Sequence, residues 1–540
     1  MRYIRIFLFS VLSFQLFGCA INSPGPRHKP VFVQPPSIEM SLDVKTPLVG
    51  VLRVSTDVPV RVVLAIKTPK KEWQISFAEF STLHTLPVLG FRAGTVHDLR
   101  VVVETREGAR TQWIDALGVQ TAPLPEMFPQ ISVKSRPDQM EPGYTLFNVM
   151  PHGDNIKFGA LTVVVDELGD VVWYTQRERF RDVRKLPDGN LLTMQGNVIE
   201  VLNMMGGLER KLVAIGPRDI RYSDEHVLTH AFHHESFAMN NGHLLVLGVE
   251  VRSFENYFTS ESDVDAPRAT VNVAGDIVIE LDASGAIVKQ WSMLDTLDPY
   301  RIGYGSLKPY WDKTLKMKTA DWAHANAVIH DVRDDSLIIS LRYQDAVIKI
   351  DRKSGDLKWI LGVHDMWDKE RFGKYLLMPL NDETFFYPFH QHSPEVTPEG
   401  NIMIYDNGSY RAMPFSDNKR VPHQAFSRAV EYKINETEMT VELVWQYGKD
   451  IDKPVYSGAL GDADYLPEKS NVLITHGSQA LQNGKQYAEV VEVTYSKPAQ
   501  EVFAMHVFDK TADPENGWRV YRSERIRDLY PVGGNAGWAE

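Results

Sequence analysis

Cysteine is almost absent from this sequence, because the 540 residues include a single one, Cys19. A lone thiol near the N-terminus excludes an intramolecular disulfide, and it leaves the rest of the chain without a cysteine nucleophile or a cysteine-based metal site. Long hydrophobic runs are also missing. The apolar run from Ile6 to Phe17 is shorter than the about 20 residues that a membrane-spanning helix needs.

No run of lysine or arginine stands out, and the formal net charge is −12 at pH 7. A nucleic-acid partner would require a basic stripe or patch, so no nucleic acid is expected to bind. The hydrophobic fraction of 43% and the charged fraction of 24% are those of a normal soluble globular protein. This length predicts two domains, or one repeat array with an additional module.

The first nineteen residues have the pattern of a lipoprotein-type signal peptide. Arg2 and Arg5 precede the apolar run, which ends in Leu16-Phe17-Gly18-Cys19 and resembles the bacterial lipobox. We therefore expect a signal peptide over 1–19 and a lipid on Cys19. Since Ala20 does not signal inner-membrane retention, the predicted location is the periplasmic side of the membrane, anchored in the outer membrane of a Gram-negative bacterium. The alternative is an ordinary cleaved signal with an incidental cysteine.

Two proline-rich stretches divide the chain, a predicted tether over 20–34 and a predicted linker over 123–142. Between them, residues 35–122 contain short alternating segments such as VRVVLAI and DLRVVVETR. Alternation of apolar and polar residues is typical of half-buried strands. The segment therefore predicts a small N-terminal β-sandwich domain, similar to fibronectin-like sandwiches.

Six strand–turn–strand stretches recur after residue 143, at 161–176, 197–213, 276–291, 345–361, 429–448 and 487–507. Between most of them lies a second unit, a turn leading into an apolar strand, as in DGNLLTM. Four strands in each of six repeats predict an all-β fold, a six-bladed β-propeller over 143–540. Three inserts interrupt the repeat, at 252–272, 292–320 and 362–388, and loops of that length are usually functional.

Histidine recurs at one frame of this repeat. His234 stands eight residues before Gly242, and His392 stands eight residues before Gly400. Each histidine leads a short segment into a turn and then a strand. Since the first strand of each propeller blade lines the central channel, histidines at one frame position in two blades are expected to converge there.

Other polar residues occupy presumed inner strands, namely His324 and Asn326 in DWAHANA and Arg342 in SLRYQ. No carboxylate has an equivalent frame, and no Ser-His-Asp arrangement is present. Arginine offers a planar fork to sulfate, phosphate or carboxylate. Histidine can act as nucleophile, general acid or general base. The set therefore indicates a reactive site for an anionic substrate.

Each of these residues also has a structural interpretation. The histidines could be satisfied core residues, and Arg342 could pair with Asp345 or Asp321. Three histidines could also bind a zinc-like metal, but no ligand pattern beyond HQH supports it, so neither a metal nor a cofactor is expected. Five further histidines are assigned structural roles, namely His226, His230, His243, His330 and His476.

The chain resembles the bacterial arylsulfate sulfotransferases over roughly 143–520, and its 35–122 segment resembles their N-terminal domain. The motifs that carry the resemblance occur in the family's order: DWAHANAVIHDVRDDSLIISLRYQDAVIKIDRKSGDLKWILG, QHSPEV, IYDNGSYR and SRAVEYKINETEMTVELVWQYGK. The resemblance implies a six-bladed propeller that moves a sulfuryl group from a phenolic sulfate to another phenol. It implies a ping-pong route through a sulfohistidine, independent of the nucleotide sulfate donor PAPS, and it suggests a homodimer.

By motif, the resemblance assigns the nucleophile to His392 and the channel partners to His234, His324, Asn326 and Arg342. Arg342 and a protonated His324 would stabilise the charge on the sulfuryl oxygens. His234 would protonate the leaving oxygen and then deprotonate the incoming phenol.

Thr475 in ITHGS is a weaker match for a hydroxyl that binds substrate together with Asn326. Family members often carry a disulfide near the nucleophile, which this chain cannot form. His390, if it lies on a strand, would share the face of His392 and could alter substrate choice. Two other functions stay open, an aryl sulfate hydrolase on the same scaffold and a non-enzymatic, lipid-anchored scaffold of the outer membrane.

Overall fold

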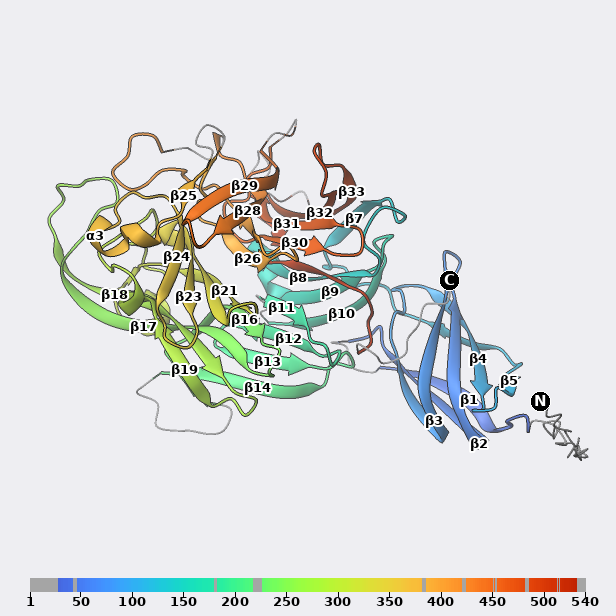
Figure 1. Ribbon diagram of the computed structural model, residues 1–540. Helices are drawn as coiled ribbons and strands as arrows, with labels where there is room; N and C mark the ends of the chain where they lie inside the picture. The colour runs from blue at the N-terminus through green and yellow to red at the C-terminus, as the bar shows by residue number, and fades with distance from the viewer. Residues whose placement is uncertain are drawn as a thin grey trace, which may run out of the picture.

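The computed structural model describes residues 28–41, 46–178, 182–216, 226–380, 385–419, 424–449, 451, 454–480, 485–511, 513 and 515–531. The chain folds into a small N-terminal sheet and six further sheets in a larger part (Figure 1). The predicted signal peptide, Cys19 and most of the predicted tether lie outside the described residues. Within the described residues no helix is long and apolar enough to cross a membrane.

The N-terminal sheet is built around one long strand. Its six strands are β1 (Phe32–Met40), β2 (Gly50–Lys67), β3 (Glu72–Val88), β4 (Val96–Glu104), β5 (Arg110–Gln112) and β6 (Leu117–Gln120). The first half of β2 pairs with β1 and the second half with β4, while β3 pairs with both halves. β5 and β6 pair with β4, so all six strands belong to one hydrogen-bonded sheet. Its buried core includes Leu52, Val62 and Val101. The two-layer packing of the predicted β-sandwich stays a prediction.

The larger part consists of six mainly antiparallel sheets, which we number I to VI in chain order. The strands of sheets I to III are: I, β8 (Tyr144–His152), β9 (Ala160–Val165), β10 (Val171–Arg177), β34 (Gly517–Arg519) and β35 (Ser523–Ile526); II, β11 (Asp182–Lys185), β12 (Leu191–Gln195), β13 (Val198–Leu202), β14 (Leu208–Ile215) and β15 (His226–Leu228); III, β16 (Phe232–Ala238), β17 (Leu244–Tyr257), β18 (Ala269–Leu281), β19 (Ile287–Ser292) and β20 (Ala320–Asp321).

The strands of sheets IV to VI are: IV, β21 (Ala325–Asp331), β22 (Ser336–Leu341), β23 (Ala346–Asp351) and β24 (Leu357–Gly362); V, β25 (Met378–Pro379), β26 (His392–Val396), β27 (Ile402–Asp406), β28 (Arg428–Asn435) and β29 (Thr440–Tyr447); VI, β30 (Asp462–Leu466), β31 (Asn471–Ala480), β32 (Gln486–Thr494), β33 (Glu501–Phe508) and β7 (Gln130–Ser135). All six strand–turn–strand stretches predicted from the sequence are present as antiparallel hairpins.

Successive sheets share hydrophobic cores. One cluster joins sheets II and III, and further clusters join III to IV, IV to V, V to VI and VI to I. A last cluster joins sheets I and II with the N-terminal sheet. Because each sheet is covered on both faces, its middle strands are mostly apolar, and every residue of β9 and β22 is buried.

The first strands of the sheets lie next to one another. Contacts run from β11 to β16, then to β21, β26 and β30, and from β30 to β35, which pairs with β8. A residue on any of these strands therefore lies close to residues on sheets that are distant in the sequence. This arrangement places the histidine-bearing segments together.

Segments from both ends of the larger part complete its sheets. The strand β7 pairs with β33 at the outer edge of sheet VI, so the predicted linker 123–142 contains a structural strand and is not only a connection. At the other end of the chain, β34 and β35 return to pair with β8 in sheet I.

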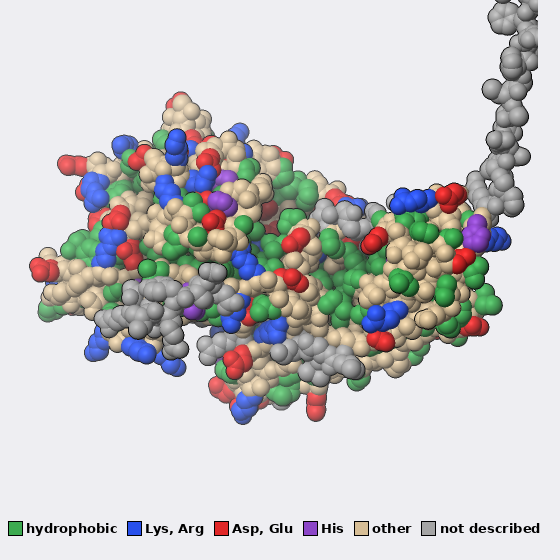
Figure 2. Space-filling model, turned by 90° about the horizontal axis from the view of Figure 1, so that it is seen from below, with side chains coloured by type: hydrophobic (Ala, Val, Ile, Leu, Met, Phe, Trp, Pro, Cys, Tyr) green, Lys and Arg blue, Asp and Glu red, His purple; other side chains and the backbone are tan. Residues whose placement is uncertain are grey.

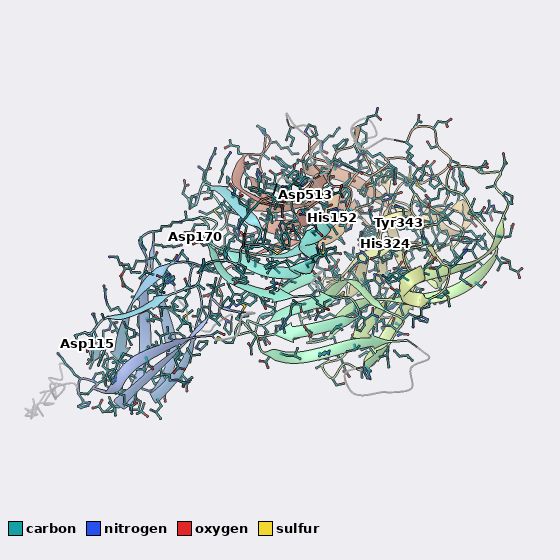
Figure 3. All side chains as sticks on the ribbon, turned by 180° about the vertical axis from the view of Figure 1, so that it is seen from behind. Asp115, His152, Asp170, His324, Tyr343 and Asp513 are labelled. Atoms are coloured by element: carbon teal, nitrogen blue, oxygen red, sulfur yellow. The ribbon has the colours of Figure 1, made fainter. Side chains whose placement is uncertain are left out.

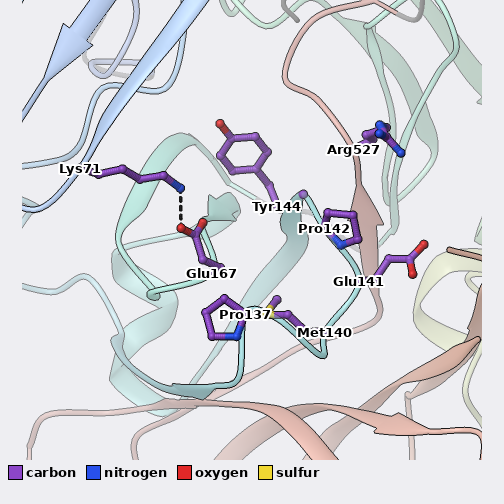
Figure 4. A pocket seen from close by; sticks show the side chains of 9 residues that line it. Lys71, Pro137, Met140, Glu141, Pro142, Tyr144, Glu167 and Arg527 are labelled. Carbon is purple, nitrogen blue, oxygen red and sulfur yellow. Dashed lines mark hydrogen bonds and ion pairs between the residues drawn. The ribbon is translucent and has the colours of Figure 1, made fainter. Parts of the chain in front are cut away.

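Polar and apolar contacts fix the N-terminal sheet to sheets I and II. The buried Arg92 guanidinium pairs with the Asp166 carboxylate, and the Tyr530 hydroxyl accepts the Leu89 N–H at 2.9 Å. Beside this junction lies a cavity of about 240 Å³, bordered by the Lys71–Glu167 ion pair (Figure 4).

All three inserts contain strand or helix. The two ends of 252–272 extend the β17–β18 hairpin, as far as Tyr257 and from Ala269 onward. The insert 292–320 carries two single-turn helices, α1 (Met293–Thr296) and α2 (Asp312–Leu315), and supplies Tyr310 and Trp311 to the histidine site described below. The insert 362–388 contains α3 (Lys369–Phe372) and β25.

Candidate active site

His392 begins β26, the first strand of sheet V, and its side chain is buried. Its Nδ1 lies 2.6 Å from Oδ1 of Asn407. The Asn407 amide nitrogen donates to the carbonyls of Ser457 and Leu460, both at 2.7 Å, so its oxygen must face the histidine. His392 therefore carries its proton on Nδ1, and the lone pair is on Nε2.

The surroundings of His392 favour its uncharged form. Burial lowers its pKa well below the usual value, and the positive charge of Arg342 lowers it further. His324 and Arg522 add smaller effects in the same direction. At neutral pH the ring is an uncharged imidazole with a nucleophilic nitrogen.

Arg342 follows β22, in the short 3-10 turn η2 (Arg342–Gln344). One Nη donates to the Gly458 carbonyl at 3.0 Å and the other approaches the Tyr343 hydroxyl at 3.4 Å. Among the described residues it forms no ion pair, so the alternative pairing with Asp321 or Asp345 is not observed: those carboxylates bind His324 and His390. A cation without a carboxylate partner is suited to an anionic ligand.

His324 is paired with a carboxylate that the sequence did not single out for this role. Its Nδ1 lies 2.5 Å from Oδ2 of Asp321, whose Oδ1 accepts the Trp311 indole N–H at 3.0 Å. Burial raises the pKa of Asp321 to about 8. Below that pH the Asp321 carboxyl keeps a proton on Oδ2 and donates it to Nδ1 of His324. The ring proton of His324 is then on Nε2, which makes Nε2 a hydrogen-bond donor.

In His234 the Nε2 nitrogen has the opposite role to that of His324: it is a base and not a donor. His233 donates from Nε2 to the Gly248 carbonyl at 3.1 Å, and burial raises the pKa of the neighbouring Asp276 well above its usual value. In the neutral tautomer that donates from Nε2, the Nδ1 of His233 is an acceptor, and it takes the Nδ1–H of His234 at 2.9 Å. The basic nitrogen of His234 is therefore Nε2.

The donor His324 and the base His234 lie side by side. The ring centroids of His234 and His324 are 4.6 Å apart, and the Tyr310 and Tyr343 rings each lie 4.7 Å from that of His324. Figure 3 shows His324 and Tyr343 next to each other inside the larger part. An aromatic group entering beside these histidines would find ring surfaces to pack on.

Irregular backbone directs these side chains. The register of the first strand shifts after His233 in β16, after Ala325 in β21 and after His392 in β26. His234 and His324 both have positive φ, 58° and 51°, which costs about 1 kcal/mol for a residue other than glycine. Bulges of this kind turn a side chain away from the regular strand alternation and are common beside active sites.

The two predicted substrate-binding residues have structural partners. Asn326 donates its amide to the Gln391 carbonyl at 2.7 Å, which links β21 to the residue before His392. The Thr475 hydroxyl lies 2.6 Å from that of Ser523 and is buried. Contact of either residue with substrate stays a prediction.

His390 does not share the face of His392, contrary to the expectation for a strand. It precedes β26 with a φ of 53°, and its ring binds Asp345 at 2.8 Å and the Tyr304 carbonyl at 2.9 Å. Both nitrogens are engaged, so His390 supports the backbone beside the nucleophile.

Sequence reasoning missed Asn407 and the role of Asp321, because it found no carboxylate at the repeat frame of the histidines. The only signal for Asn407 was its place in IYDNG, directly after a strand. Over the described part of the chain, no three His, Cys, Asp or Glu side chains are grouped so that they could hold a metal ion.

The chain is similar to known proteins in sequence. Arylsulfate sulfotransferases from Escherichia coli O6:H1 and Lelliottia amnigena are each 26% identical over 59% of this chain, which spans 57% of their length. A solved auxiliary nutrient binding protein from Bacteroides thetaiotaomicron is 8% identical, with a TM-score of 0.29 over 92% of this chain and 91% of its own. The Arylsulfotransferase (ASST) family profile matches residues 130–522, and the chain therefore belongs to this family.

Proposed function

We propose that this protein is a PAPS-independent sulfotransferase that moves a sulfuryl group from a phenolic sulfate ester to another phenol by a ping-pong mechanism through a sulfohistidine. The six sheets would be the blades of a six-bladed propeller, with the site in its central channel. The observation that carries the proposal is the buried His392, held by Asn407 so that its lone pair is on Nε2, close to Arg342, which forms no ion pair among the described residues.

In the first half-reaction, His392 Nε2 attacks sulfur, the sulfur–oxygen bond to the aryl group breaks, and the phenolate leaves with the bonding electrons. Arg342 and the Nε2–H of His324 stabilise the negative charge on the sulfuryl oxygens. His234 enters this step as the imidazolium, with protons on Nδ1 and Nε2, and gives the Nε2 proton to the leaving oxygen, so that Nε2 is left with its lone pair. In the second half-reaction it takes the proton of the incoming phenol, whose oxygen then receives the sulfuryl group.

The assay is incubation of the purified protein with p-nitrophenyl sulfate, with and without added phenol. Release of p-nitrophenol that depends on phenol supports the transferase. Release without phenol supports the alternative hydrolase, in which water replaces the acceptor. No release in either case supports a non-enzymatic scaffold, which would have no use for a buried histidine beside the Arg342 guanidinium.

We also propose that Cys19 is lipidated and that the protein is attached to the membrane on the periplasmic side. The motive is the sequence LFGC after the short apolar run. Labelled palmitate should enter the wild-type protein and not the Cys19→Ser variant; equal labelling of both would refute the anchor. A homodimer is proposed from family resemblance alone, and sedimentation equilibrium would test it.

A further inference from the structure

The segment between β34 and β35 contacts the site, although no sequence motif indicates this contact. Tyr521 and Arg522 lie between β34 and β35, near the C-terminal end of the described chain. The Tyr521 hydroxyl donates to the Asn326 carbonyl at 3.3 Å, and its ring centroid lies 6.3 Å from that of His234. The closing segment therefore touches both β16 and β21.

Arg522 is buried, with 1% of its side chain exposed. One Nη donates to Glu235 at 2.5 Å and the other donates to the Ser393 hydroxyl at 3.1 Å. Its Nε lies 3.4 Å from an oxygen of Asp182 and 3.8 Å from one of Asp462. The guanidinium thus binds residues of four sheets at once.

The two Nη partners are the direct neighbours of the reactive histidines. Glu235 follows His234, and Ser393 follows His392, and each of these pairs lies where the strand register shifts. Glu235 also accepts the Val328 N–H of β21 at 3.1 Å, and Ser393 donates to the Gly461 carbonyl at 3.1 Å. Since a bulge has lost its regular ladder bonds, these side-chain bonds hold its backbone in place.

We propose that Arg522 is a positioning residue for sulfuryl transfer: through Glu235 and Ser393 it fixes the distance between the nucleophile His392 and the acid–base residue His234. This inference rests on the proposed function. Arg522 acts through its neighbours, because its donors are directed at Glu235 and Ser393. Ser393 and Asp462 also border a cavity of about 410 Å³ whose lining does not include the three histidines.

Arg525 provides a matched control. It lies in the same closing segment, its side chain is 1% exposed, and it likewise binds a carboxylate and a hydroxyl, those of Glu492 at 2.7 Å and Thr145 at 2.6 Å. Neither partner adjoins a reactive histidine. Any effect of losing a buried guanidinium in general should appear equally in Arg525→Lys and Arg522→Lys.

The experiment compares steady-state sulfuryl transfer by wild type, Arg522→Lys, Arg525→Lys, Ser393→Ala and the double variant Arg522→Lys/Ser393→Ala. Lysine keeps the charge but cannot bridge two partners. We expect Arg522→Lys to lower kcat about 100-fold with KM changed less than about twofold. Arg525→Lys should keep the wild-type kcat. The double variant should lose no more activity than Arg522→Lys alone, because both substitutions break the same contact, that between Arg522 and Ser393.

The pH profile supplies a second readout. The charges facing His392 are those of Arg342, His324 and Arg522. Arg522→Gln removes one of these charges, which raises the pKa of His392 and moves the acidic limb of kcat to higher pH. Arg525→Gln should leave that limb in place, and so should Arg522→Lys, whose charge is retained.

Equal losses in Arg522→Lys and Arg525→Lys, or additive losses in the double variant, would overturn the proposal. If the Arg522 variants do not fold, as judged by circular dichroism, Ser393→Ala decides: a kcat equal to that of wild type overturns the inference, and a loss of about tenfold supports it. Absence of transfer by wild type would refute the proposed function itself, so the two failures are distinguishable.

Discussion

A single hydrogen bond sets the chemistry of His392. Asn407 can present only its oxygen to His392, because its nitrogen donates to two carbonyls. The proton of His392 must therefore be on Nδ1. Burial removes the competing charged form. The resulting nucleophile needs no general base of its own, which explains why His234 is available for the phenol proton.

Replacement of His392 tests the nucleophile directly. His392→Ala should reduce transfer roughly 10⁴-fold, because the bond to sulfur can no longer form. Mass spectrometry of donor-treated, acceptor-free wild type should find one sulfonate on the peptide that contains His392. The exposed His506, paired with Glu489, provides the control, and His506→Asn should keep full activity. An adduct on His234 would contradict the assignment.

Asp321 predicts a basic limit to activity. Its pKa is raised to about 8, so the additional proton shared with His324 is present below that pH and lost as pH rises through it. We expect kcat to fall above about pH 8 as the Nε2–H donor disappears.

In Asp321→Asn the Trp311 N–H orients the amide oxygen, so the amide nitrogen donates to His324 at every pH and the limb should move to higher pH. Asp335, which pairs with His330 at 2.8 Å, offers a matched control. Asp335→Asn should leave the profile unchanged. A basic limb that stays near pH 8 in Asp321→Asn would assign it to another group.

At the scale of elements, β7 shows how an apparent linker stabilises sheet VI. The Arg136 N–H donates to the Val502 carbonyl at 2.8 Å, and alternation along the strand directs the Ser132 N–H toward β33 as well. Ser132→Pro should lower the free energy of unfolding by about 2 kcal/mol, since a ladder bond is lost and an acceptor is left unpaired.

The Ser132 side chain is exposed, so Ser132→Ala keeps the ladder and should unfold like wild type. Urea unfolding followed by tryptophan fluorescence would compare the two variants. Equal midpoints for Ser132→Pro and wild type would show that β7 contributes nothing to the stability of the sheet.

At the scale of the whole molecule, the N-terminal sheet is attached through a buried ion pair. The Arg92 and Asp166 side chains are 6% and 0% exposed. Arg92→Met would leave the Asp166 carboxylate buried without its cation and should cost about 3 kcal/mol of stability. Arg53, whose pair with Glu39 at 3.7 Å is exposed, is the control, and Arg53→Met should cost under about 1 kcal/mol. Guanidinium unfolding measures both, and equal costs would contradict a structural role for the buried pair.

One face of the molecule carries surface charge of both signs. On the face in Figure 2, basic and acidic side chains are intermixed over both parts of the molecule. Specific charge is instead concentrated inside, where Arg522 meets Glu235, Asp182 and Asp462. Buried ion pairs therefore connect the sheets next to the reactive histidines.

The sequence by itself determined the strands and the residues of the repeat. Apolar alternation and turn residues are local properties, so all six hairpins could be predicted, and the glycines after His234 and His392 do adopt positive φ, 83° at Gly242 and 84° at Gly400. The same local logic could not distinguish a linker from the strand β7, because its partner lies over 360 residues away along the chain.

Only the tertiary structure decided which nitrogen of each histidine is protonated and which residues hold it. His390 and His392 look alike in the sequence, yet one is bound on both sides and the other presents a lone pair. Their difference depends on Asp345 and Asn407, which other strands bring into place. Protonation is set by burial and by partners in space, and these are properties of the assembled sheets that a linear pattern does not contain.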